Sequence, residues 1–266
     1  MEKSNLFFKV CNNQDKYNII NGNGEYISDQ WFDTILFNCL KEGYFVVQLN
    51  GKYNYIGKNG KYLSEQWFDL CFSFENGWAI IKNNNKENLI NTKGELLFKN
   101  EWPIFVSKMY VDGYCVVWNE NGKETIVDNN GIYLYPNTWF DLIIKQYNKN
   151  SLKINSIFNE DYAIVRKNGQ FNFINKNGEY LSEQWFYDVD MFVNGYAMVY
   201  SEKEDGYNFL NKNGKLISNE WFYHASNFND NGVAIVDRKR DIRNYINGNG
   251  EFIINYNDNI KYVEML

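Results

Sequence analysis

The chain has one histidine that could take part in catalysis or bind a metal. His224 follows Trp221-Phe222-Tyr223, at a place where similar segments carry other residue types. A catalytic triad or a histidine-based metal site needs partner residues at defined positions, and a single histidine supplies none of them. We therefore expect His224 to be a local hydrogen-bonding residue.

Aspartates that recur shortly after a tryptophan are the other candidates for chemistry. Two carboxylates held close together can act as general acid and base in hydrolysis. Because these aspartates recur at one place in a repeating pattern, capping a turn or forming a ladder is the more natural role, and we expect no catalysis from them. The four positions are Asp33, Asp69, Asp141 and Asp188.

Glycine-rich turns and cysteines give no sign of a cofactor or a metal. Gly22-Asn23-Gly24 lacks the third glycine and the helix of a dinucleotide fingerprint, and Asn229-Asp230-Asn231-Gly232 lacks the carboxylates of a calcium loop. The cysteines form no CxxC pair and are widely spaced, so we expect reduced thiols in a reducing compartment. They are Cys11, Cys39, Cys71 and Cys115. The sequence predicts neither an enzyme nor a bound cofactor.

Charge and hydropathy narrow the classes of partner. The net charge is −6 and the isoelectric point is about 5.0, the wrong sign for a surface that must collect phosphates. No stretch approaches 18 apolar residues, and residues 1–10 are too polar for a secretory signal. We expect a soluble, cytoplasmic protein with no nucleic-acid or membrane partner.

The elements that must position these residues come from an internal repeat. An Asn/Gly-rich turn that ends in glycine occurs seven times, at spacings of 36, 34, 37, 47, 36 and 36 residues, and a tryptophan follows six of the glycines by seven or eight positions. Such a period indicates an array of stacked units. We predict one domain, 1–266, with repeats near 15–51, 52–86, 87–123, 124–170, 171–206, 207–242 and a partial copy at 243–266.

The clearest copy predicts the unit strand by strand. We expect strands at 171–175, 179–181 and 195–200, a tight turn ending at Gly178, and a loop or helical turn at 182–186 with Trp185 filling the gap between layers. The fold is therefore all-β, with about three strands per repeat and almost no helix. An open superhelical stack is the prediction. The alternative is a closed six- or seven-bladed propeller, because residues 6–10 read as a third strand that the last copy could accept.

One asparagine recurs in the first strand of the repeats, two positions before an aliphatic residue. An inward-facing amide at every layer can donate to and accept from the backbone of adjacent copies, so we expect a buried structural ladder. Thr125 takes its place in repeat four. The asparagines are Asn18, Asn54, Asn88, Asn172, Asn208 and Asn244.

The unit resembles the WG-containing (KWG) repeat over roughly residues 15–256. The similarity lies in the aromatic first strand, the turn glycine, the Phe-Asp pair and the late Gly-aromatic-Ala-hydrophobic-Val strand. The Trp-Gly dipeptide of that family is replaced here by Tyr17-Asn18, Tyr53-Asn54, Phe171-Asn172 and Tyr207-Asn208. The resemblance implies a β-rich array without a catalytic motif.

Function must then come from the surface. Our leading hypothesis is a non-enzymatic protein-interaction module; the alternative is a carbohydrate- or small-ligand-binding protein with aromatic pockets between layers. An insertion in repeat four supplies Lys145, Tyr147, Lys149 and Lys153. A late aromatic row either seals the stack or forms a stacking platform, and consists of Tyr44, Trp78, Tyr114, Tyr162 and Tyr196. A protein partner predicts asymmetry centred on the insertion, and a small ligand predicts one similar pocket per layer.

Overall fold

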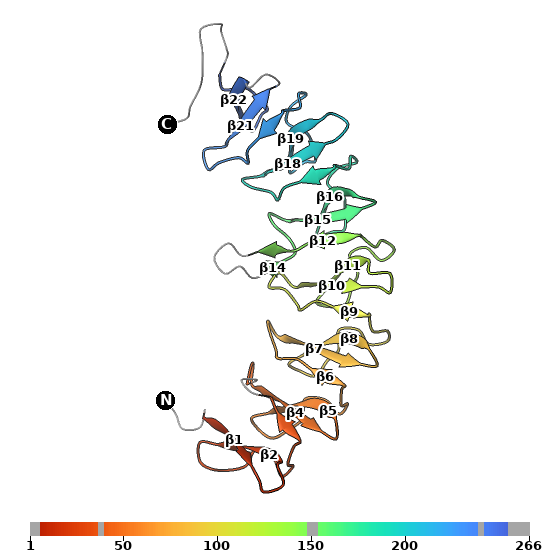
Figure 1. The fold of residues 1–266 in the computed structure, drawn as a ribbon, viewed down its shortest axis with the longest axis vertical. Helices are drawn as coiled ribbons and strands as arrows, with labels where there is room; N and C mark the ends of the chain where they lie inside the picture. The colour runs from red at the N-terminus through yellow and green to blue at the C-terminus, as the bar shows by residue number, and fades with distance from the viewer. Residues whose placement is uncertain (1–5, 37–39, 148–153, 239–241, 255–266) are drawn as a thin grey trace. The chain divides into compact units, whose positions relative to one another are not determined.

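The computed structural model describes residues 6–36, 40–147, 154–238 and 242–254 (Figure 1). The chain forms two compact units, Met1–Tyr133 (unit 1) and Leu134–Leu266 (unit 2), and each is described by itself. Within the described ranges every regular element is a β-strand and there is no helix. The all-β prediction is confirmed.

Unit 1 contains one two-stranded and three three-stranded antiparallel sheets. Their orders are β1-β2, β3-β4-β5, β6-β7-β8 and β11-β10-β9. The strands are β1 (Phe7–Cys11), β2 (Tyr17–Asn21), β3 (Thr34–Ile35), β4 (Tyr44–Leu49), β5 (Lys52–Gly57), β6 (Leu70–Cys71), β7 (Trp78–Asn83), β8 (Lys86–Asn91), β9 (Phe105–Val106), β10 (Tyr114–Trp118) and β11 (Glu124–Asp128).

Unit 2 repeats the same arrangement and adds a small hairpin. Its sheets are β12-β15-β16, β13-β14, β17-β18-β19 and β20-β21-β22, all antiparallel. The strands are β12 (Leu142–Ile144), β13 (Gln146–Tyr147), β14 (Ile154–Ser156), β15 (Tyr162–Lys167), β16 (Gln170–Asn175), β17 (Asp188–Val189), β18 (Tyr196–Ser201), β19 (Gly206–Asn211), β20 (His224–Ala225), β21 (Val233–Arg238) and β22 (Ile242–Asn247).

Each long hairpin joins the third strand of one repeat to the first strand of the next. β4 pairs with β5 from Tyr44↔Gly57 to Leu49↔Lys52, around a two-residue turn at Asn50-Gly51. Both turn residues have positive φ, 52° and 77°, as a tight turn that matches strand twist requires. Asn168-Gly169 forms the same turn between β15 and β16, so an Asn-Gly dipeptide sets the register of these two hairpins.

Three strands per sheet is correct, but the identity of one of them was predicted wrongly. Residues 179–181 make only an isolated bridge, Ile174↔Tyr180. The sheet is instead completed by the two-residue segment that follows the tryptophan, such as β17, which takes the place of the strand predicted at 179–181. The reason is a side chain: the amide of Asn172 binds the carbonyl of Ser182 and so replaces the backbone ladder that would continue the predicted strand.

The phenylalanine that follows the tryptophan in five repeats fills the core between repeats, whereas we predicted this role for the tryptophan. Repeat three has Pro103 at this place. Phe186 is 1 % exposed, and Trp185 is only half-buried. A phenyl ring can be buried completely because it has no polar atom, while the indole N–H needs a partner or solvent. The buried rings are Phe32, Phe68, Phe140, Phe186 and Phe222.

The recurring asparagines are buried, as predicted, but they do not link adjacent copies. Each donates its amide N–H to a carbonyl ten residues later in its own repeat, over 2.8–2.9 Å. Each also accepts from the N–H of the next residue through Oδ1. The predicted ladder between copies is therefore wrong, because the loop that folds back over each amide supplies its hydrogen-bond partners. We call this arrangement the asparagine clamp.

The turn glycines make the contact between successive repeats of one unit. A Cβ on Gly214, which has a φ of +75°, would lie 2.0 Å from the carbonyl oxygen of Leu181 in the preceding repeat. Gly24 has no preceding turn beneath it, and a Cβ there would meet nothing within 4 Å. The same close approach recurs at Gly60, Gly94, Gly131, Gly178 and Gly250.

The first strand has the role that the sequence predicted. β1 pairs with β2 from Phe7↔Asn21 to Cys11↔Tyr17, the same register that β4 makes with β5. It therefore takes the place of a third strand, paired with the first strand of repeat one. In a closed ring, β1 would pair with the last repeat. Residues 255–266 of that repeat lie outside the described residues, so the choice between an open stack and a closed ring stays a prediction.

Candidate interaction surface

The late aromatic row seals neighbouring repeats and is not an open platform. The Tyr162 ring lies 5.0 Å from Phe192, and the Tyr196 ring lies 4.2 Å from Phe228. In unit 1, Tyr44 packs on Phe74 and donates its hydroxyl to the carbonyl of Thr92 over 2.8 Å. All members of the row are half-buried: Tyr44, Trp78, Tyr114, Tyr162 and Tyr196.

Trp78 differs from Tyr44 and Tyr162 because it has no hydroxyl that could donate a hydrogen bond to the carbonyl of a neighbouring turn. A pocket of about 370 Å³ lies beside it, with a Lys108–Glu75 ion pair of 2.6 Å at its wall. The pocket walls are Phe72, Ser73, Glu75, Trp78, Ile80, Leu89 and Lys108.

The insertion in repeat four contributes a short hairpin. β13 pairs with β14 through Gln146↔Ser156 and Tyr147↔Ile154, with a bulge between them. Lys145 is half-buried, and Lys149 and Lys153 lie outside the described residues. The insertion is thus in part a paired strand, not only a loop.

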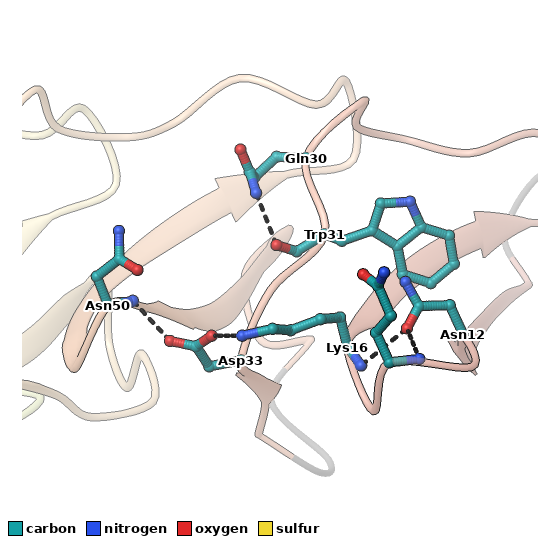
Figure 2. Close-up of polar contacts among 7 residues, drawn as sticks. Asn12, Lys16, Gln30, Trp31, Asp33 and Asn50 are labelled. Carbon is teal, nitrogen blue, oxygen red and sulfur yellow. Dashed lines mark hydrogen bonds and ion pairs between the residues drawn. The ribbon is translucent and has the colours of Figure 1, made fainter.

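Three of the four recurring aspartates, Asp33, Asp69 and Asp141, cap hairpin turns, as expected, and Figure 2 shows Asp33. Asp33 forms an ion pair with Lys16, and its second oxygen accepts from the N–H of Asn50 over 2.6 Å. Asp69 repeats the contacts, with Lys52 and with the N–H of Asn84. The hydrogen bond from the lysine holds the pKa of Asp33 and that of Asp69 below the ordinary value.

Replacing Lys52 with glutamine is expected to raise the pKa of Asp69 toward its usual range and to leave that of Asp33 unchanged. A carboxyl with a lowered folded pKa stabilises the fold above its unfolded pKa, and this contribution is lost as pH falls through the folded pKa. Lys52→Gln should therefore lose this stabilisation at neutral pH and match the wild type in acid, below the folded pKa of Asp69. A carboxyl-carbon NMR titration of the wild type and the variant measures both pKa values, and an unchanged pKa of Asp69 would contradict the assigned pair.

Asp188 and His224 do not belong to this set. At the place of Asp33 and Asp69, repeats five and six carry Tyr187 and Tyr223, which are 53 % and 54 % exposed. The Oδ1 atom of Asp188 accepts from the N–H of Val189. His224 is exposed, with its ring edge-on to Tyr223 at 4.6 Å.

An exposed pair of aromatic rings recurs in the loop that the asparagine clamp holds, and sequence reasoning missed it. Tyr26 with Trp31, Tyr62 with Trp67, and Tyr180 with Trp185 have centroid distances of 5.6, 5.2 and 5.3 Å. The tyrosines are 58 %, 40 % and 39 % exposed, and the tryptophans are half-buried. We call each pair an aromatic rung. The signal was the motif Tyr-Ile/Leu-Ser-Asp/Glu-Gln-Trp-Phe, present in repeats one, two and five.

Rung two illustrates how local structure fixes these rings. Tyr62 bridges Ile56 in β5, and Asn54 donates to the carbonyls of Ser64 and Gln66, over 2.8 and 3.3 Å. Immediately after Trp67, the chain is fixed by two backbone hydrogen bonds between Phe68 and Tyr53. The rung is thus carried by a loop that is bonded on both sides.

Successive repeats of one unit support each other's rungs. The edge of Tyr62 meets Phe32 of the preceding repeat at 6.4 Å, and Tyr180 meets Phe140 in the same way at 6.5 Å. Burial of part of each ring raises the pKa of Tyr62 and of Tyr180. These phenols stay neutral, and their exposed parts are apolar surface with a hydroxyl at the tip.

Carboxylates precede five of the recurring tryptophans, those of the three rungs included, and we call them the rung carboxylates. One stands one or two positions before the tryptophan in five repeats, and all five are exposed. Glu220 forms an ion pair with Arg238 over 2.9 Å, and the others have no ion pair within the part of the chain that the structure describes. The five are Asp29, Glu65, Glu101, Glu183 and Glu220.

No cluster of three or more His, Cys, Asp or Glu side chains able to hold a metal occurs among the described residues. Cys71 and Cys115 are buried free thiols, Cys11 is an exposed one, and burial raises the pKa of Cys71 to about 12. A thiol with so high a pKa is a poor nucleophile. Cys39 lies outside the described residues. In the described ranges, no helix is long and apolar enough to cross a membrane.

Several solved structures overlap with this chain at low similarity. BamB from Moraxella catarrhalis is 10 % identical, with 96 % of this chain and 85 % of that chain covered and a TM-score of 0.29. Hsv2p from Kluyveromyces lactis is 10 % identical, with 91 % and 88 % covered and a TM-score of 0.31. The C-terminal WD40 domain of Sif2 is 11 % identical, with 92 % and 76 % covered and a TM-score of 0.29.

No curated protein is similar enough to the chain to count as a relative. A family model described as a WG containing repeat matches residues 55–86, beginning one residue after Tyr53-Asn54. This stretch runs from β5 through rung two and β7 to the start of β8. The sequence-based resemblance is supported there, and residues 55–86 are similar to a WG containing repeat.

Proposed function

We propose that this chain is a non-enzymatic protein-interaction module that presents a β-repeat surface to a macromolecular partner, with the aromatic rungs as the contact residues. The observation that carries the proposal is the exposure of Tyr26, Tyr62 and Tyr180 on loops held by hydrogen bonds from buried asparagines. Tyrosine and tryptophan dominate the binding energy of protein interfaces, and rings that are already fixed lose little entropy on binding.

Replacing both Tyr62 and Tyr180 with alanine is expected to weaken partner binding at least tenfold, about 1.4 kcal/mol, because each ring removes a large apolar contact. A photocrosslinking amino acid placed at Tyr62 or Tyr180 in host cells identifies the partner by mass spectrometry, and the purified partner is then titrated against both proteins.

Asn121 and Lys203 lie in hairpin turns and are exposed, so the crosslinker at these positions is the matched control. Equal crosslinking at rungs and turns, or unchanged affinity of a folded double variant, would reject the rungs as the contact surface. Labelling from position 147 alone would return the assignment to the insertion in repeat four.

A second candidate, a carbohydrate-binding protein, is favoured by one observation. The rung recurs in nearly the same geometry in repeats one, two and five, as binding of a repeating ligand would require. Exposed rings beside glutamine and serine side chains can stack on sugar rings and bond their hydroxyls. Titration with linear oligosaccharides, followed by tryptophan fluorescence, tests this candidate.

We also propose the cytoplasm, or an equally reducing compartment, as the location. The buried, free thiols of Cys71 and Cys115 fit this proposal. Thiol labelling of the denatured protein from its host measures it, with all four cysteines expected to react.

A further inference from the structure

We propose that the rung surface of unit 1 binds an extended basic segment of a partner protein, whose arginine or lysine side chains dock between a rung carboxylate and an aromatic ring. This inference rests on the proposed function and names the chemistry of the partner. The residues assigned to it are Asp29, Tyr62, Glu65 and Trp67.

Unit 2 already contains one such contact, made by the chain's own Arg238. Its guanidinium donates to Glu220 over 2.9 Å and lies 4.1 Å from the centre of the Phe252 ring. Glu220 precedes Trp221, and Phe252 stands in repeat seven at the place of Tyr62 in repeat two. One arginine therefore contacts both a rung carboxylate and the aromatic ring of the following repeat.

Unit 1 has the same pair of rings without an arginine in place. Its carboxylate, Asp29, lies two residues before Trp31, one position earlier than Glu220 lies before Trp221. The Phe222–Phe252 distance of 6.0 Å has its counterpart in Phe32–Tyr62 at 6.4 Å. Asp29 stands in the loop of repeat one that meets repeat two, because a Cβ on Gly60 would touch the carbonyl of Ile27. Tyr62 is 40 % exposed, and Asp29 has no ion pair among the described residues.

Charge complementarity selects a basic partner. Asp29 and Glu65 are exposed and unpaired in the described chain, and the protein carries a net charge of −6. A cation over the face of tryptophan or tyrosine is attracted by the ring, and a nearby carboxylate adds to that attraction. Because rungs recur from repeat to repeat, a segment with several basic side chains can engage more than one of them.

The probe for the test is the peptide (Arg-Gly)6, with (Glu-Gly)6 and chitohexaose as comparisons, titrated against the full chain by tryptophan fluorescence. We expect (Arg-Gly)6 to bind and the two comparison ligands not to bind, and the affinity for (Arg-Gly)6 should fall as the salt concentration rises. The double variant Asp29→Asn/Glu65→Gln should raise the Kd at least about threefold, as loss of two exposed ion pairs implies. Asp15→Asn/Glu120→Gln removes the same charge from hairpin turns of unit 1 and should change little.

Arg238→Ala provides a test by gain of binding. Removing this side chain frees Glu220 and Phe252, so the number of bound peptides or the affinity should rise. Lys203→Ala, an exposed change of equal charge, should have no such effect. Thermal melts establish that each variant is folded.

Several results would overturn the inference. No binding of (Arg-Gly)6, equal losses in the rung and turn variants, or no gain in Arg238→Ala relative to Lys203→Ala would each do so. Rung-dependent binding of chitohexaose in place of the basic peptide would assign the surface to glycans. If Tyr62 and Tyr180 still crosslink to a protein while the peptide fails, this inference fails and the proposed function stands.

Discussion

Gly214→Ala is expected to destabilise the chain by about 2–5 kcal/mol, and Gly24→Ala by only about 1 kcal/mol. Both glycines have positive φ, +75° and +86°, so both variants carry the strain of a left-handed alanine. Only the alanine at position 214 would also press against backbone, the carbonyl oxygen of Leu181 at 2.0 Å. Gly24 is therefore a matched control that separates strain from the contact between repeats.

Urea unfolding followed by tryptophan fluorescence measures the two losses, and hydrogen exchange shows whether the repeat of Leu181 opens with that of Gly214. Larger loss at position 214 with joint opening supports glycine as the contact between repeats. Equal losses at both positions would mean that backbone conformation alone explains the glycines, and the contact assigned here would be wrong.

Asn208→Leu is expected to cost about 3–5 kcal/mol, because three backbone groups around a fully buried amide lose their hydrogen-bond partner. Asn208 is 0 % exposed and donates to the carbonyls of Ser218 and Glu220, over 2.9 and 3.1 Å. Its Oδ1 accepts from the N–H of Phe209. Leucine has nearly the same volume, so the loss reports hydrogen bonds and not a cavity.

Asn211→Ala is the control, because Asn211 bonds two backbone N–H groups of the exposed turn and should cost much less. Asn208→Asp adds a test by pH. A carboxylate facing two carbonyls has a raised folded pKa, so the variant should lie closest to wild type in acid and lose stability as pH rises through that pKa. A pH-independent penalty would contradict the clamp.

The sequence was informative wherever one residue type has one use. Asn-Gly dipeptides predicted the two-residue turns at Asn50-Gly51 and Asn168-Gly169, because few other residues accept positive φ at both positions. The buried asparagines were found because a polar residue in an aromatic strand requires a partner. The partner itself could not be predicted, since a side chain that reaches a loop ten residues away and one that reaches a neighbouring copy leave the same pattern.

The surface was predicted less well for a related reason. Tyr44 and Tyr62 are both aromatic residues that recur once per repeat, and periodicity alone does not tell which of them faces the next layer. The structure separates them by the partner of each ring: Tyr44 packs on Phe74 and gives its hydroxyl to a carbonyl, whereas Tyr62 is 40 % exposed beside Trp67. Asp188 was grouped with Asp33 because both follow a Trp-Phe pair closely, but Tyr187 takes the place of Asp33, and Asp188 stands where repeat one has Thr34.

Hydroxyl-radical footprinting of tyrosines, with and without the crosslinked partner, tests most directly whether the rungs are the binding surface. Tyr187 and Tyr223 are as exposed as the rung tyrosines but stand outside the rungs, so they are internal controls. We expect Tyr62 and Tyr180 to lose reactivity when the partner binds and the two controls to keep theirs. Protection of Tyr187 and Tyr223 with unchanged reactivity at Tyr62 and Tyr180 would contradict this account.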